Sequence, residues 1–340
     1  MGDSLEALCG FNPRRPLVLD GGFGQLIADK YPHLDMSDGL WASGVAVRCP
    51  DVIRYVHLMY LRAGADIIST ATYQASANGY ISAGLANDKA GAKRLMESTL
   101  LLAVEARDQY MREHGCATRL GQPMISASLG SIGATLGNCS EYTGDYGCAV
   151  TPARMREFHE ERLGMLADCL HGSVGLRDQI DLLAIETIPS AAEASAVADA
   201  LEALHGRGTR LPPAWISFTS STADRIGCGD TIEDAVKAIA NCPRVCAIGI
   251  NCVPLGVVGE LLAGIRRATQ KPIVCYPNGQ PWSDANGGWH ADDGLISAAH
   301  FACEAAEWVR CGASIVGGCC RTTAENTRAL VERMLELRHE

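Results

Sequence analysis

The chain has 340 residues, 47% hydrophobic and 20% charged, a composition typical of a compact globular protein rather than a disordered one. Its net charge is −10 and it contains no Lys/Arg-rich run, which excludes nucleic acid and anionic membranes as expected partners. Fifteen cysteines occur in a chain whose first residues lack the apolar stretch of a signal peptide. A secreted disulfide scaffold is therefore excluded, and we expect a cytoplasmic protein with reduced thiols.

Eight short apolar runs without in/out alternation predict buried parallel strands. In chain order they are Leu17–Asp20, Asp66–Thr70, Met124–Ser128, Leu182–Glu186, Trp215–Thr219, Ala247–Asn251, Ile273–Tyr276 and Ser314–Gly317. A segment with helical periodicity follows each run. These segments are Asp51–Arg62, Asp88–Glu113, Ala153–Cys169, Ala191–Leu204, Ile232–Ala240, Val257–Ala268, Ile296–Cys311 and Ala324–Leu337. The alternation predicts one α/β domain over residues 1–340, a (β/α)₈ TIM barrel whose active face lies at the carboxyl ends of the strands.

Three cysteines stand at predicted strand ends, on that active face. Cys319 and Cys320 are adjacent after the eighth strand, and Cys252 follows the sixth. A vicinal disulfide is strained and rare in a reduced cytosol, whereas three thiolates and one open position fit a catalytic zinc ion. The spacing alone equally allows the alternative that these are small core residues, as free cysteines commonly are.

Acidic residues end two of the apolar runs. Asp20 precedes Gly21 and Gly22, and Glu186 ends the fourth predicted strand. The first segment is similar to the nucleotide-binding turn of Rossmann methyltransferases, which remains one interpretation. The other is that both carboxylates bind a cationic group such as an α-ammonium, because a charge in an apolar strand end needs a partner. A third possibility is that each acid caps a helix or pairs with an arginine.

Aromatic residues accompany the strand-end loops, the longest of which are Gly130–Thr151 and Asn278–Leu295. Aromatic rings around one barrel mouth favour a sulfonium or ammonium ligand through cation–π attraction, although most aromatic residues are simply packed. An alternative role for Gly317 and Gly318 is to bind a phosphate group through their backbone. The aromatic residues are Phe23, Trp41, Tyr73, Tyr142, Tyr146, Tyr276 and Trp282.

Over almost its whole length the chain resembles the homocysteine S-methyltransferase family. The specific part is the pair of motifs G-I-N-C at Gly249–Cys252 and G-G-C-C at Gly317–Cys320. Further similar segments are 20–22, 72–76, 128–131, 140–142 with Gly144 and Tyr146, 186–189 and 276–278. The last three resemble the branch that uses S-methylmethionine or adenosylmethionine more than the betaine branch.

The resemblance implies the chemistry. Cys252, Cys319 and Cys320 would hold Zn²⁺ and so serve catalysis, the sulfur of homocysteine would be its fourth ligand, and Asp20 and Glu186 would hold the amino group. The remaining substrate contacts would be Gly21, Asn251 and Tyr276. The implied reaction moves a methyl group from S-methylmethionine, with S-adenosylmethionine as a second candidate donor, to L-homocysteine and forms L-methionine. We expect small-molecule substrates only, and a monomer.

Two departures from the family pattern leave the donor contacts open. After Asn278 the family commonly continues Ser-Gly-Glu, whereas this chain has Gly279-Gln280-Pro281-Trp282, and Ser190 stands where Asn is usual. Betaine as donor, and a non-catalytic zinc- or redox-sensing thiol protein, remain alternatives.

Length and the remaining cysteines complete the expectations. The length excludes a folate/cobalamin methionine synthase, and the chain lacks the tetramerisation arm of the betaine branch. We expect the other twelve cysteines, Cys275 and Cys311 among them, to be mostly inert filling of helices and strands.

Overall fold

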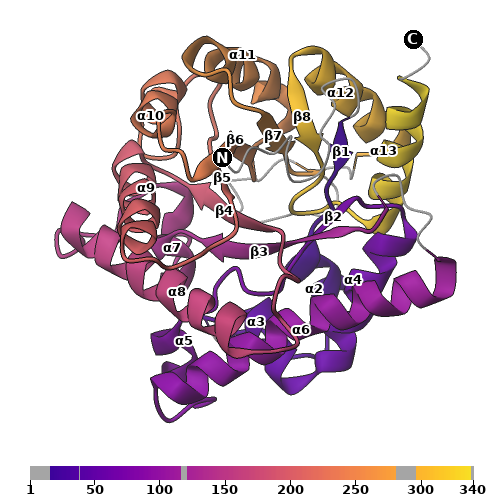
Figure 1. The fold of residues 1–340 in the computed structure, drawn as a ribbon. Helices are drawn as coiled ribbons and strands as arrows, with labels where there is room; N and C mark the ends of the chain where they lie inside the picture. The colour runs from indigo at the N-terminus through magenta and orange to yellow at the C-terminus, as the bar shows by residue number, and fades with distance from the viewer. Residues whose placement is uncertain (1–15, 38, 116–120, 281–295, 338–340) are drawn as a thin grey trace.

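The computed structural model describes residues 16–37, 39–115, 121–280 and 296–337. Eight parallel strands form a barrel with helices around its outside (Figure 1). Hydrogen bonds join the strands in the order β1-β8-β7-β6-β5-β4-β3-β2, and a bridge between Leu19 and Ile67 connects β1 to β2. The strands are β1 Leu17–Val18, β2 Ile67–Ser69, β3 Met124–Gly130, β4 Leu182–Ile188, β5 Ala214–Phe218, β6 Val245–Asn251, β7 Ile273–Tyr276 and β8 Ala313–Val316. The predicted TIM barrel is confirmed.

The eight predicted helices are present, with ends that differ by a few residues. They are α4 Pro50–Arg62, α6 Lys89–His114, α8 Pro152–Gly172, α9 Ala191–Gly206, α10 Ile232–Ile239, α11 Val258–Ala268, α12 Ala298–Arg310 and α13 Ala324–Glu336. In the described part of the chain, no helix is both long enough and apolar enough to cross a bilayer.

Short helices in the strand-end loops were not predicted. They are α2 Phe23–Lys30, α3 Ala42–Arg48, α5 Ala77–Ser82, α7 Ile132–Leu136 and the 3₁₀ turns η1 Ser140–Tyr142 and η2 Leu255–Val257. Helices of this length are not stable by themselves and depend on tertiary contacts, so their sequence carries little periodic signal. The loop after β3 therefore holds α7 and η1 over the barrel mouth.

Two apolar layers explain why the strands lack alternation. Inside the barrel, Trp215 packs with Leu17, Ile67 and Ile315 in one cluster, so the interior is a packed core rather than a channel. A second and larger cluster lies between the strands and the helices, where Val18, for example, is buried. Both faces of each strand are buried, as expected for a parallel sheet covered by helices.

The cysteines outside the strand ends do not all fill the core. Cys275 is buried in β7, as expected, but Cys311 is exposed. Cys139, Cys148, Cys228 and Cys303 are exposed as well. The expectation of inert filling is therefore wrong for these residues, because a small apolar side chain at a loop or helix surface carries little penalty for exposure.

Candidate active site

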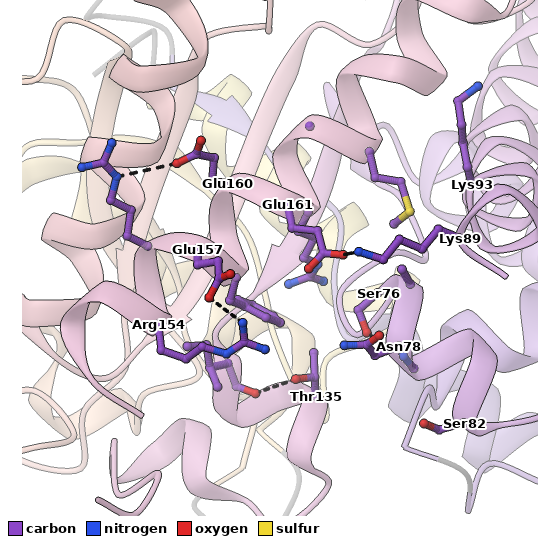
Figure 2. Close-up of a pocket in the computed structure, with 18 of the residues that line it drawn as sticks. Ser76, Asn78, Ser82, Lys89, Lys93, Thr135, Arg154, Glu157, Glu160 and Glu161 are labelled. Atoms are coloured by element: carbon purple, nitrogen blue, oxygen red, sulfur yellow. Dashed lines mark hydrogen bonds and ion pairs between the residues drawn. The ribbon is translucent and has the colours of Figure 1, made fainter. Parts of the chain in front are cut away.

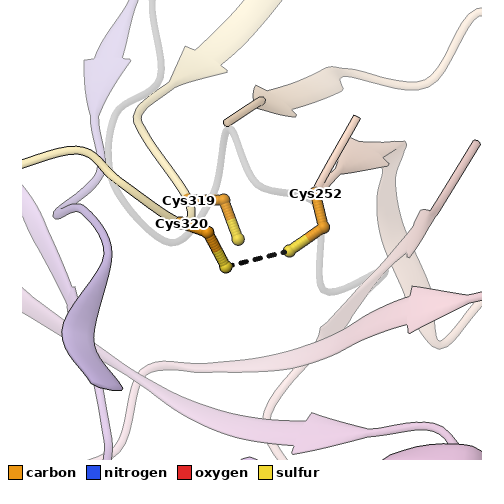
Figure 3. Close-up of side chains that lie close together, drawn as sticks. All are labelled: Cys252, Cys319 and Cys320. Atoms are coloured by element: carbon orange, nitrogen blue, oxygen red, sulfur yellow. Dashed lines mark hydrogen bonds between the residues drawn. The ribbon is translucent and has the colours of Figure 1, made fainter. Parts of the chain in front are cut away.

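Three cysteine thiols converge at the mouth of the barrel. Cys319 and Cys320 lie side by side on the segment after β8, and Cys252 faces them from the end of β6 (Figure 3). Their Sγ atoms all lie within 4.8 Å of one another, and those of Cys252 and Cys320 are 4.0 Å apart. Cys252 is buried, whereas the other two are partly accessible. The predicted strand-end positions thus bring the three sulfurs together.

Backbone hydrogen bonds from the loop after β7 hold the cysteines in place. The amide of Cys252 donates to the carbonyl of Tyr276 at 3.3 Å, and the amide of Cys319 donates to the carbonyl of Pro277 at 2.8 Å. Cys252 has a φ of 51°, a left-handed conformation that is costly for a residue with a side chain. Strained backbone of this kind persists only where neighbouring residues hold it in place. In Cys252 this conformation directs the thiol toward the barrel mouth.

Glycines beside the cysteines allow the loops after β1 and β8 to approach each other. A Cβ at Gly318 would lie 2.3 Å from Oγ1 of Thr322, and one at Gly22 would lie 2.5 Å from the carbonyl oxygen of Cys319. The amide of Gly22 also donates to Oγ1 of Thr322 at 3.0 Å. Neither the nucleotide-binding turn nor the phosphate cradle is supported, because these glycines serve packing within a closed barrel.

Two buried carboxylates lie across the same mouth. Asp20 accepts hydrogen bonds from the amide of Ser69 at 2.7 Å and from its hydroxyl at 3.3 Å. Burial raises the pKa of Asp20 to about 8, and the charge of Glu186 adds to the shift. Burial also raises the pKa of Glu186, which accepts a short hydrogen bond from the hydroxyl of Ser128. Neither carboxylate caps a helix or makes a direct ion pair with a described residue, although the charge of Arg162 lessens the rise in the pKa of Glu186.

Asn251 is engaged within the protein. Its Oδ1 accepts from the amide of Thr187 and the hydroxyl of Ser217, both at 2.8 Å, and its Nδ2 donates to Oγ1 of Thr187 at 2.8 Å. Thr187 has a φ of 60° and directly follows Glu186. Asn251 therefore fixes the strained end of β4 that carries this carboxylate, and its role as a substrate contact stays a prediction.

Tyr276 and Gly21 also have neighbours within the barrel. The hydroxyl of Tyr276 lies 2.6 Å from that of Ser217 and accepts from Nε1 of Trp215 at 3.1 Å. A Cβ at Gly21 would lie 2.8 Å from Oγ1 of Thr322. Gly21 thus lets the loop after β8 pack closely, and a direct contact of either residue with substrate stays a prediction.

Two further tyrosines border the thiols. Burial and then nearby acidic groups, including Cys252, raise the pKa of Tyr73. The pKa of Tyr142 is raised by burial of its hydroxyl and then by Cys252 and Cys320, although 37% of the residue is exposed. The loops after β2 and β3 therefore supply an aromatic wall to the site.

The other predicted aromatic residues do not belong to this wall. The ring of Phe23 contacts that of His57 at a tilt of 46°, with ring centroids 4.7 Å apart, and Trp41 lies against Gly24. The hydroxyl of Tyr146 donates to Glu193 at 2.5 Å. These three residues do lie in the loops after β1 and β3, as predicted, and a contact of their rings with a ligand stays a prediction. Trp282 lies outside the described residues.

Sequence reasoning missed Arg162, a buried residue on α8. Its guanidinium donates to the carbonyls of Ala75 and Gly130, both at 2.7 Å, to that of Thr72 at 3.0 Å, and to that of Tyr73. These carbonyls belong to the loops after β2 and β3 that carry the aromatic wall. The available signal was an arginine on the apolar face of the predicted helix 153–169.

A hollow of about 1420 Å³ lies outside the barrel, between α5, α6 and α8 (Figure 2). Lys89 pairs there with Glu161 at 2.5 Å, and Arg154 pairs with Glu157 at 2.6 Å. Arg162 borders this hollow, but none of the three site cysteines does. Because its charged groups largely neutralise one another, the hollow offers no clear ligand chemistry, and the chemistry resides at the thiols.

The structure describes Ser190 and Gln280 among the departures from the family pattern, whereas Pro281 and Trp282 lie outside the described residues. Ser190 is the N-cap of α9, and its hydroxyl accepts from the amide of Glu193 at 3.1 Å. Serine and asparagine are about equally good in this position. Gln280 is buried and accepts from Nε of Arg321 at 2.9 Å, next to the site cysteines. This glutamine therefore positions the segment after β8.

A closed (β/α)₈ barrel with a thiol cluster at its mouth defines a barrel enzyme with a candidate metal centre. The profile of the family described as homocysteine S-methyltransferase matches residues 17–334. The chain therefore belongs to the homocysteine S-methyltransferase family and is a methyltransferase enzyme, which confirms the resemblance seen in the sequence.

Individual relatives agree with this assignment. Homocysteine S-methyltransferase 4 of Zea mays is 37% identical over 95% of this chain and 90% of its own length. Selenocysteine methyltransferase of Astragalus bisulcatus is 35% identical over 93% of this chain and 91% of its own. The metallated form of the homocysteine methyltransferase MmuM from Escherichia coli superposes with a TM-score of 0.76, at 33% identity over 95% of this chain and 100% of that one. That E. coli relative therefore has a metallated form.

Proposed function

We propose that this enzyme transfers a methyl group from S-methylmethionine to L-homocysteine, that S-adenosylmethionine is a second donor, and that a Zn²⁺ ion bound to Cys252, Cys319 and Cys320 takes part. The observation that carries the proposal is the convergence of these three thiols beside two buried carboxylates. Membership of the family supports the reaction, and the metallated form of the E. coli relative supports a metal.

The three thiol ligands fit zinc. Tetrahedral Zn²⁺ with Zn–S distances of about 2.3 Å separates its sulfurs by about 3.8 Å. The sulfurs of Cys252 and Cys320 are 4.0 Å apart, so small rotations would complete the geometry. When bound, Zn²⁺ would lower the pKa of the homocysteine thiol and hold it as a thiolate nucleophile. Three protein ligands leave one position for that sulfur.

The chain's own residues then bind and orient the substrates. Asp20 and Glu186 attract the α-ammonium of homocysteine, because two buried carboxylates that make no direct ion pair with a described residue favour a positive ligand. Asn251 holds the end of β4 in place for this contact. Tyr73 and Tyr142 exclude water from the space above the thiols and align the donor for in-line transfer. The C–S bond of the donor breaks as the new C–S bond forms, leaving a neutral thioether.

The test replaces one thiol and compares donors. Cys252→Ser should lose both zinc, measured by metal analysis, and methyl transfer, while circular dichroism shows an intact barrel. Cys311→Ser is the matched control, since Cys311 is exposed and should leave zinc and turnover unchanged. Turnover by Cys252→Ser without zinc would refute the mechanism. With wild type, a strong preference for betaine over S-methylmethionine under equal conditions would refute the donor assignment.

We also propose a cytoplasmic location. Every cysteine in the described ranges is free, including the exposed ones, which is typical of a reducing compartment. Fractionation of cells that express the natural protein would test it.

A further inference from the structure

The turn η1 holds Glu141 and Tyr142 rigidly beside the barrel mouth. A Cβ at Gly133 would lie 2.2 Å from the amide nitrogen of Glu141, and a Cβ at Gly227 would lie 2.4 Å from the carbonyl oxygen of Tyr142. The turn also contacts the end of β4. The two glycines therefore pack directly against the backbone of η1. This packing fixes the directions in which the side chains of η1 point.

One oxygen of the Glu141 carboxylate lacks a partner. Its Oε2 is buried and has no hydrogen-bond partner among the residues that the structure describes. Burial raises the pKa of Glu141, and a hydrogen bond from its own backbone amide offsets only part of this rise. A buried acceptor without a partner is costly, so such groups in native proteins commonly await a ligand.

Glu141 stands on a turn that packs against β4, the strand that carries Glu186. Next to burial, the charges of Glu141 and then of Cys252 raise the pKa of Tyr73. Tyr142, next to Glu141 in the chain, is near Cys252 and Cys320. The acceptor's amino group is assigned to Asp20 and Glu186. Glu141 is therefore a further carboxylate in the same part of the barrel mouth as the two tyrosines.

We propose that Glu141 is a specificity-determining residue whose carboxylate binds the positively charged sulfonium centre of the methyl donor. This inference rests on the proposed function. A sulfonium donates no N–H or O–H hydrogen bond, so its recognition depends on charge and on aromatic faces, and this corner of the site offers both. When the methyl group leaves, the sulfonium becomes a neutral thioether and the attraction disappears. Glu141 therefore favours binding of the donor and release of the product.

The test compares a charged ligand with its neutral counterpart. Calorimetry on the zinc-loaded protein measures binding of S-methylmethionine and of methionine, which differ in the sulfonium methyl and its charge. Glu141→Gln should bind S-methylmethionine roughly 10-fold or more weakly, while methionine binds nearly as in wild type. In kinetics, KM for the donor should rise and KM for homocysteine should not. Asp145→Asn is the matched control, because Asp145 is exposed on the same loop.

Other outcomes overturn the inference. Equal weakening of S-methylmethionine and methionine would show that Glu141 holds the ammonium group or only shapes the site. Unchanged binding of both would show that it holds neither. Glu141→Asp keeps the negative charge and should keep the preference for S-methylmethionine over methionine. Loss of this preference in a Glu141→Asp variant that still binds homocysteine normally would contradict the inference. A wild type that binds S-methylmethionine in preference to methionine but transfers no methyl group would refute the proposed function, not this contact.

Discussion

Replacing Arg162 by lysine tests whether one buried side chain secures the loops of the site. The arginine is 3% exposed and donates to four carbonyls, those of Ala75, Gly130, Thr72 and Tyr73. Its planar fork reaches acceptors in two loops at once, whereas a lysine ammonium is a compact point charge. We expect at least two of the four carbonyls to lose their partner in Arg162→Lys.

The magnitude follows from these bonds. A hydrogen bond to a charged group contributes about 1.5 to 3 kcal/mol, and an unsatisfied buried carbonyl costs a similar amount. Loss of two such bonds should lower the free energy of unfolding by about 3 kcal/mol or more. Because Tyr73 belongs to the loop that is released, KM for the donor should also rise.

Urea denaturation followed by circular dichroism measures the first effect and donor titration the second. Arg154→Lys is the control, because Arg154 lies on the same helix but is exposed and makes only a surface ion pair with Glu157. Such pairs contribute about 0 to 1 kcal/mol. If Arg162→Lys were no less stable than Arg154→Lys, the anchoring role would be refuted.

Two further predictions concern pH and packing. Burial, and to a smaller extent the charge of Glu186, raises the pKa of Asp20 from an ordinary value near 4 to about 8. Folding therefore favours the neutral form of this carboxyl group. The stability of ligand-free wild type relative to Asp20→Asn should therefore be greatest below about pH 4 and fall as pH rises through 8. A difference that stays constant with pH would contradict this. Gly318→Ala should weaken zinc binding, measured by competition with a chelator, because its Cβ would lie 2.3 Å from Oγ1 of Thr322 and displace the cysteine segment. Gly259→Ala, which has open space around it, should leave zinc affinity unchanged; equal affinity in both variants would count against the packing argument.

The local sequence pattern is enough to predict the barrel and to single out its three strand-end thiols. Alternation of buried strands with amphipathic helices is a local pattern, and a closed barrel is the arrangement that buries both faces of eight such strands. The position of Cys252 and Cys320 at strand ends is readable for the same reason, because all parallel strands direct their carboxyl ends to one face. The acids Asp20 and Glu186 stood out as charges in apolar runs.

The partners of these groups depend on contacts between segments that are far apart in the chain. The hydrogen bonds of Arg162 and Asn251 reach residues far away in the chain, and no local pattern encodes such pairings. The short turn that carries Glu141 has no periodicity to read, because it is held by Gly133 and Gly227 rather than by its own propensity. Exposure of Cys311 likewise depends on packing around the helix end. The reactive sulfurs lie where they do because the ends of parallel strands share one face of the barrel. The residues that surround these sulfurs are set by long-range packing.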